Sequence, residues 1–94
     1  MKEYYLTKEV IQRFEQYLKN EEKSENTVEK YLRDVRSFIA FPGENEATKE
    51  TVIAYKNRLI EENYAVRSIN SMLASLNSLF VFLGWTECKV KSIK

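Results

Sequence analysis

The 94-residue sequence contains no histidine, one cysteine, one proline and two glycines. Without histidine, the chain lacks the side chain that most often acts as a general base or metal ligand near neutral pH. Its single cysteine, Cys88, excludes an internal disulfide and a cysteine-based metal site. No glycine-rich phosphate-binding loop is present either. The sequence therefore predicts no catalytic residue, no metal site and no cofactor in this chain.

Basic and acidic residues nearly balance, at 15 against 14, so the formal net charge is only +1. A nucleic-acid partner would therefore have to be recognised by local clusters of charge. The charge is uneven, because residues 63–94 carry four basic residues and one acidic residue. The start of the chain is too short and polar for a signal peptide, and the uncharged stretch 68–86 contains Asn70, Asn77 and four serines. We expect a soluble, cytoplasmic protein with no membrane partner.

Apolar residues recur at intervals of three and four along most of the chain, which predicts helices and no strand. The first helix is expected over about residues 8–21, with Thr7 as its N-cap. The second is expected to begin at Asn26, with Glu29 completing a capping box, and to end at Pro42.

The third helix is expected to begin at Thr48 and to turn Ile60 toward the core. The fourth is expected to begin near Arg67 and to end at Gly84, because glycine readily adopts the left-handed conformation that closes a helix. This pattern predicts an all-α fold, a compact bundle of four main helices.

We expect the whole chain, residues 1–94, to form a single domain. The helical bundle would occupy about residues 6–86, with Trp85 folded back against it. Residues 87–94 would then remain as a basic tail.

The predicted fourth helix has an unusual outer face, lined by Ser71, Ser75 and Ser78 rather than by charged residues. A surface helix usually carries lysine and glutamate on that side. A small neutral face is either covered by another part of the fold or kept smooth so that a large partner can approach. We favour the second interpretation, with DNA as the partner.

Two helices offer residues suited to DNA. Backbone N–H groups and hydroxyls at a helix start bind phosphate oxygens, and asparagine can pair with an adenine edge in the major groove. The candidate DNA-binding residues are Asn26, Thr27, Lys30 and Arg33 on the second helix, and Arg67, Ser68, Asn70, Ser71 and Ser75 on the fourth.

Spacing alone leaves other functions open. Lys30 and Arg33 alternate with Glu29 and Asp34, as on an ordinary solvated helix face. Small residues also allow close helix approach, so the serine-lined helix could dock on another protein. The pattern therefore permits DNA binding, protein binding or neither.

A wider pattern of residues joins these features. It consists of Asn26-Thr27-Val28, Tyr31, Asp34-Val35 and Phe38, and, after Pro42-Gly43, of Ser68-Ile69-Asn70, Leu73, Leu76, Leu79-Phe80 and Phe82-Leu83. In order and spacing, these residues resemble the N-terminal core-binding domain of tyrosine recombinases of the phage-integrase type. The resemblance covers about residues 6–94.

The resemblance implies a SAM-like helical bundle that grips core-site DNA as half of a clamp during integration and recombination. The family's DNA-facing positions fall on the candidate residues given above. Residues 87–94 would begin a basic linker to a C-terminal catalytic domain of the same parent chain, which would be a tyrosine recombinase. The implied partners are double-stranded DNA, that catalytic domain and other recombinase protomers on the DNA.

No catalytic residue of the family is carried over, because the domain that holds them is absent, and no tyrosine in this chain corresponds to the nucleophile. The alternative function is a SAM-like protein-interaction module that does not bind DNA.

Overall fold

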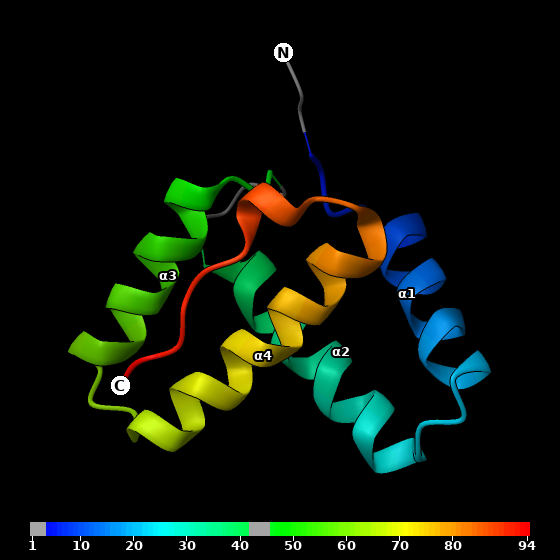
Figure 1. Cartoon of the computed structure of the whole chain (residues 1–94), viewed down its shortest axis with the longest axis horizontal. Coiled ribbons are helices and arrows are strands. Elements are labelled where there is room, and N and C mark those ends of the chain that lie inside the picture. The colour runs from blue at the N-terminus through cyan, green and yellow to red at the C-terminus, as the bar shows by residue number, and fades with distance from the viewer. Residues whose placement is uncertain (1–3, 42–45) are drawn as a thin grey trace.

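The computed structural model describes residues 4–41 and 46–94. These residues form four α-helices and one short 3-10 helix (Figure 1). The elements are α1 (Lys8–Asn20), α2 (Glu25–Ala40), α3 (Lys49–Glu61), α4 (Val66–Leu83) and η1 (Thr86–Cys88). Extended pairing within the described ranges is limited to one isolated bridge between Tyr5 and Glu46. The predicted all-α bundle of four main helices is confirmed.

Three helix ends follow from the local sequence as predicted. The Thr7 hydroxyl accepts the N–H of Val10 at 3.2 Å, which satisfies one free donor at the start of α1. Thr48 caps α3 through a reciprocal capping box with Thr51. Gly84 closes α4 in the left-handed conformation, with φ +75°.

The start of α2 differs from the prediction. Ser24, not Asn26, is the N-cap, and its hydroxyl accepts the N–H of Thr27 at 3.2 Å. The helix therefore begins at Glu25, which places Asn26 inside its first turn. At the other end α2 stops at Ala40, and the predicted helix stop at Pro42-Gly43 lies outside the described residues.

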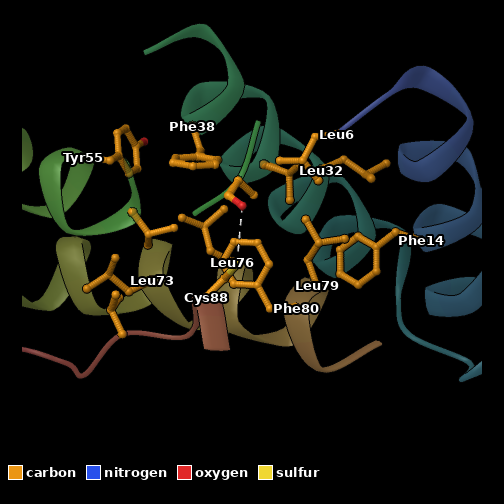
Figure 2. Packing of buried hydrophobic residues seen from close by; sticks show 14 of the residues in the cluster. Leu6, Phe14, Leu32, Phe38, Tyr55, Leu73, Leu76, Leu79, Phe80 and Cys88 are labelled. Carbon is orange, nitrogen blue, oxygen red and sulfur yellow. Dashed lines mark hydrogen bonds between the residues drawn. The ribbon is translucent and has the colours of Figure 1, made fainter. Parts of the chain in front are cut away.

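The core forms where α2 and α4 cross at the centre of the bundle, with α1 packed on α2 and α3 packed on α4 (Figure 1). Figure 2 shows that the buried side chains converge from all four helices, with Phe14, Phe38 and Phe80 at most 1% exposed. Tyr55 is also buried, and its hydroxyl lies 2.8 Å from the hydroxyl of Ser37. Burial of this apolar surface is the main stabilising contribution to the fold.

The prediction that Ile60 faces the core is wrong, because its side chain is 46% exposed. On α3 the buried residues are Val52, Tyr55 and Leu59. Ile60 follows Leu59 by one residue, which is about 100° around the helix, and this rotation turns it to solvent.

After Gly84 the chain folds back, as expected, and Trp85 stacks on Tyr4 with ring centroids 4.4 Å apart. Residues 89–94, which the sequence predicts to be a basic tail, return along α4 on the side of α3 (Figure 1). We call residues 89–94 the C-terminal strap. Cys88 and Val90 are buried, so one side of α4 is covered by the chain itself.

By length and composition, α4 is apolar enough to cross a membrane, with a mean hydropathy of 1.3 over 18 residues. This differs from the prediction that its serines and asparagines make it too polar. In the fold α4 is the central helix, and its apolar side packs against α2, α3 and η1. Its composition is therefore that of a core helix.

Candidate functional site

A groove of about 530 Å³ lies between α2 and α4. We call it the α2–α4 groove. Its walls are Lys30, Arg33, Asp34 and Ser37 from α2, Tyr64 from the loop after α3, and Arg67, Ser68, Ser71 and Met72 from α4. The crossing of the two helices creates this groove, so residues more than 30 positions apart in the sequence share one surface.

The α2–α4 groove gathers five of the nine candidate residues, namely Lys30, Arg33, Arg67, Ser68 and Ser71. The cations Lys30, Arg33 and Arg67 thus share one surface with Ser68 and Ser71. The contacts they make with a ligand stay a prediction.

Ser75 lies between α2 and α4 and is completely buried, so its predicted place on an outer face is wrong. Its hydroxyl donates to Asp34 Oδ2 at 2.7 Å. The small side chain lets the two helices approach, and the hydroxyl satisfies a buried carboxylate that would otherwise be costly. Ser75 cannot contact a ligand outside the bundle in this structure.

Asp34 does not lie on a solvated helix face, the simplest interpretation of its alternation with basic residues, because it is only 5% exposed. Its carboxylate pairs with Lys30, with Nζ and Oδ2 2.6 Å apart. Lys30 Nζ also donates to the Ser71 carbonyl and to Ser75 Oγ, both at 3.3 Å. The lysine and the carboxylate thus form a closed polar network between α2 and α4.

Asp34 is the residue that sequence reasoning missed. The sequence carried a signal for its ion pair, because Asp34 follows Lys30 by one helical turn, but none for its burial, which depends on Ser75 of α4.

Arg33 and Arg67 carry the uncompensated positive charge of the groove. Both are exposed, and neither has a hydrogen-bond or ion-pair partner among residues 4–41 and 46–94. They come from opposite walls, Arg33 from α2 and Arg67 from the first turn of α4. An anion seated between them could accept hydrogen bonds from two guanidinium groups.

Asn70 lies away from the groove and is engaged by the C-terminal strap. Its side-chain amide donates to the Ile93 carbonyl at 2.9 Å and accepts the Ile93 N–H at 2.7 Å. Asn77, two turns later, makes the same pair of bonds to Val90, at 2.9 and 3.1 Å. The predicted place of Asn70 on an open helix face is therefore wrong, because residues of this chain occupy its donor and its acceptor.

Asn26 and Thr27 lie in the first turn of α2, outside the lining of the groove. Asn26 is exposed, whereas Thr27 is half-buried and its hydroxyl accepts a hydrogen bond from Ser24 Oγ at 2.9 Å. Tyr64, from the loop after α3, is 46% exposed and lines the groove with Arg67. In the part of the chain that the structure describes, no three potential metal ligands lie close enough to hold an ion.

Comparison with known proteins agrees with this architecture. The family model described as "Phage integrase, N-terminal SAM-like domain" matches residues 11–87. A tyrosine recombinase XerA from Thermococcus onnurineus (strain NA1) is 35% identical over 79 residues, which are 84% of this chain and 27% of that protein. Tyrosine recombinase XerA from Pyrococcus furiosus is 31% identical over 87 residues, 93% of this chain and 30% of the relative. The chain thus spans less than a third of the length of these relatives. No solved structure gives a significant match.

Proposed function

The chain belongs to the family of phage-integrase N-terminal SAM-like domains, and from this membership we propose that it is a DNA-binding domain that grips double-stranded DNA through the α2–α4 groove. The observation that carries the proposal is the pair of arginines, Arg33 and Arg67, on opposite walls of that groove, neither of which has a partner among the described residues. Guanidinium groups bind phosphate in a planar fork, and such contacts supply most sequence-independent affinity for DNA.

Hydroxyl groups beside these cations extend the proposed surface. Ser68 and Ser71 line the groove on α4, within the turn that follows Arg67. Serine hydroxyls donate to phosphate oxygens and to base edges. In this arrangement the arginines set affinity, and the small residues allow α4 to approach the DNA closely.

The first turn of α2 provides a second contact with the DNA backbone in this proposal. Asn26 is exposed there, and the N-terminus of α2 carries a partial positive charge from its free N–H groups. A phosphate next to this turn would be held by Asn26 and backbone N–H groups.

The parent protein, in this proposal, is a tyrosine recombinase, because the relatives named above are tyrosine recombinases that extend well beyond the matched region. The domain described here would contribute half of a clamp on core-site DNA in the cytoplasm and would perform no chemistry. A C-terminal catalytic domain of the same chain would close the clamp, and further protomers would assemble on the DNA.

The test is a fluorescence-anisotropy titration of the domain against a random-sequence duplex at several salt concentrations. With four to six phosphate contacts, log K should fall against log salt with a slope of roughly −4 to −5. The Arg33→Gln, Arg67→Gln double variant should bind at least about tenfold more weakly, because two charged hydrogen-bonding groups are lost. Arg13→Gln removes one charge from α1, which does not line the groove, and should leave the affinity within about twofold.

Absence of binding at low salt by a folded domain would overturn the proposal. That result would favour the alternative function, a SAM-like protein-interaction module. A salt response close to flat would equally exclude a phosphate-binding groove.

A further inference from the structure

We propose that Lys30 is a positioning residue of the α2–α4 groove rather than a phosphate contact. An ammonium group has three N–H donors and no acceptor. Lys30 has three acceptors around its Nζ: Asp34 Oδ2 at 2.6 Å, the Ser71 carbonyl at 3.3 Å and Ser75 Oγ at 3.3 Å. All three donors are used inside the protein, so a phosphate could bind only by displacing one of them.

The charge of Lys30 is also compensated. Asp34 is 5% exposed and carries a carboxylate that needs a nearby cation and hydrogen-bond donors. Lys30 supplies the cation, and the fully buried Ser75 donates to the same oxygen, Oδ2. Seen from the groove, the lysine and aspartate together are nearly neutral.

The contacts of Lys30 join two helices. Its own helix, α2, also holds Asp34, whereas Ser71 and Ser75 belong to α4. The ammonium therefore fixes the distance between the two walls on which Arg33 and Arg67 stand. Lys30 shapes the groove, and the two arginines supply its attraction for an anion.

This assignment rests on the proposed function, because it concerns how the same groove binds DNA. A groove lysine can bind phosphate directly or hold the groove walls in place, and the two roles predict different salt dependences. Replacing a lysine that contacts phosphate removes one phosphate contact and should make the salt slope shallower by about 0.9. Replacing a positioning lysine together with its carboxylate should leave the slope unchanged.

The experiment uses the double variant Lys30→Met, Asp34→Asn, which keeps the net charge and removes the ion pair. We expect its salt slope to be unchanged, because no phosphate contact is lost, and any fall in its affinity for the duplex to be the same at every salt concentration. Arg67→Gln is the matched control, and its slope should become shallower by about 0.9. A double variant whose slope becomes shallower by the same amount would overturn the assignment of Lys30.

A thermal-unfolding cycle of the two single variants and the double variant tests the positioning role without DNA. Lys30→Met alone leaves a buried carboxylate without its cation and should lower Tm by roughly 5 °C or more. The double variant should recover most of that loss. Additive shifts with no recovery would overturn the positioning role, whereas failure of the wild type to bind DNA would overturn the proposed function instead.

Discussion

Ser75 shows that a single hydroxyl at a helix crossing can be structural. It is completely buried and donates to Asp34 at 2.7 Å. We expect Ser75→Ala to lower the free energy of unfolding by about 1–2 kcal/mol, because the buried carboxylate loses one of its donors. Urea denaturation followed by circular dichroism measures this change.

Ser78→Ala is the matched control for Ser75→Ala. Ser78 lies on the same helix, is half-buried and has no side-chain hydrogen bond within the described residues. Both substitutions bring the same gain in helix propensity, so the difference between the two variants isolates the network. Equal unfolding free energies for the two variants would contradict the role assigned to Ser75.

The buried thiol of Cys88 should make the fold less stable at alkaline pH. Burial raises the pKa of its thiol from 9.0 to about 11, and the thiol donates to the Ala47 carbonyl (Figure 2). Below pH 9 the thiol is neutral in both the folded and unfolded states, so its contribution is fully present. Between pH 9 and about 11 the unfolded state ionises first, and stability declines as pH rises.

Urea midpoints measured across this pH range test the prediction for Cys88. A Cys88→Ala variant should show a shallower alkaline decline, with the remainder due to groups such as Tyr55, whose pKa is also raised by burial. An identical decline in the two proteins would show that the thiol does not contribute.

Single residues in this chain were predictable where local chemistry decides their role. Thr7, Thr48 and Gly84 act as helix ends because each satisfies or closes the backbone next to it. Asp34 and Ser75 were misplaced because their burial depends on contacts 41 positions apart, which helical periodicity does not contain.

The C-terminal strap is attached to α4 by two asparagine side chains. Asn70 and Asn77 are seven residues apart on α4, or about 10.5 Å along a helix. Val90 and Ile93 are three residues apart in extended chain, which is about 10 Å. The two distances agree, so each asparagine meets the backbone of one strap residue and forms two hydrogen bonds with it.

Asn77→Ala should detach the strap at Val90. The loss of two hydrogen bonds should reduce the free energy of unfolding by about 1–2 kcal/mol. In amide hydrogen exchange followed by NMR, the Val90 N–H should lose its protection first, because it donates to Asn77 Oδ1. Asn57→Ala, an exposed substitution on α3, is the control and should leave Val90 protected. Unchanged protection of Val90 in Asn77→Ala would contradict the attachment.

The sequence pattern predicted the bounds of the helices better than it predicted what packs against each helix face. Periodicity identifies which side of a helix is apolar, and the bounds of α1, α3 and α4 agree with it closely. It does not show what covers the other side. For α4 the first interpretation of the small neutral face holds in part, because Ser75 is buried against α2 and the strap covers Asn70 and Asn77. Ser71 lines the groove, and the approach of DNA to it stays a prediction.

At the scale of the whole molecule, the proposed attraction to DNA depends on where the charges lie rather than on the net charge. The formal net charge is +1, which gives little long-range attraction to DNA. The α2–α4 groove brings together two arginines that have no partner in the described part of the chain, and their proximity depends on how α2 and α4 cross. Composition could not reveal it, although the family resemblance pointed to the same two helices.

A charge-relocation variant tests whether the groove or the net charge governs DNA binding. Arg33→Gln with Arg67→Gln removes two positive charges. Glu9→Gln on α1 with Glu21→Gln at the C-cap of α1 restores the net charge to +1. We expect this quadruple variant to bind a duplex at least about tenfold more weakly than the wild type, as we expect of the arginine double variant. Its salt slope should be shallower by about 1.8, because two phosphate contacts are lost. Recovery of wild-type affinity would mean that overall charge, rather than the arrangement of Arg33 and Arg67, determines binding.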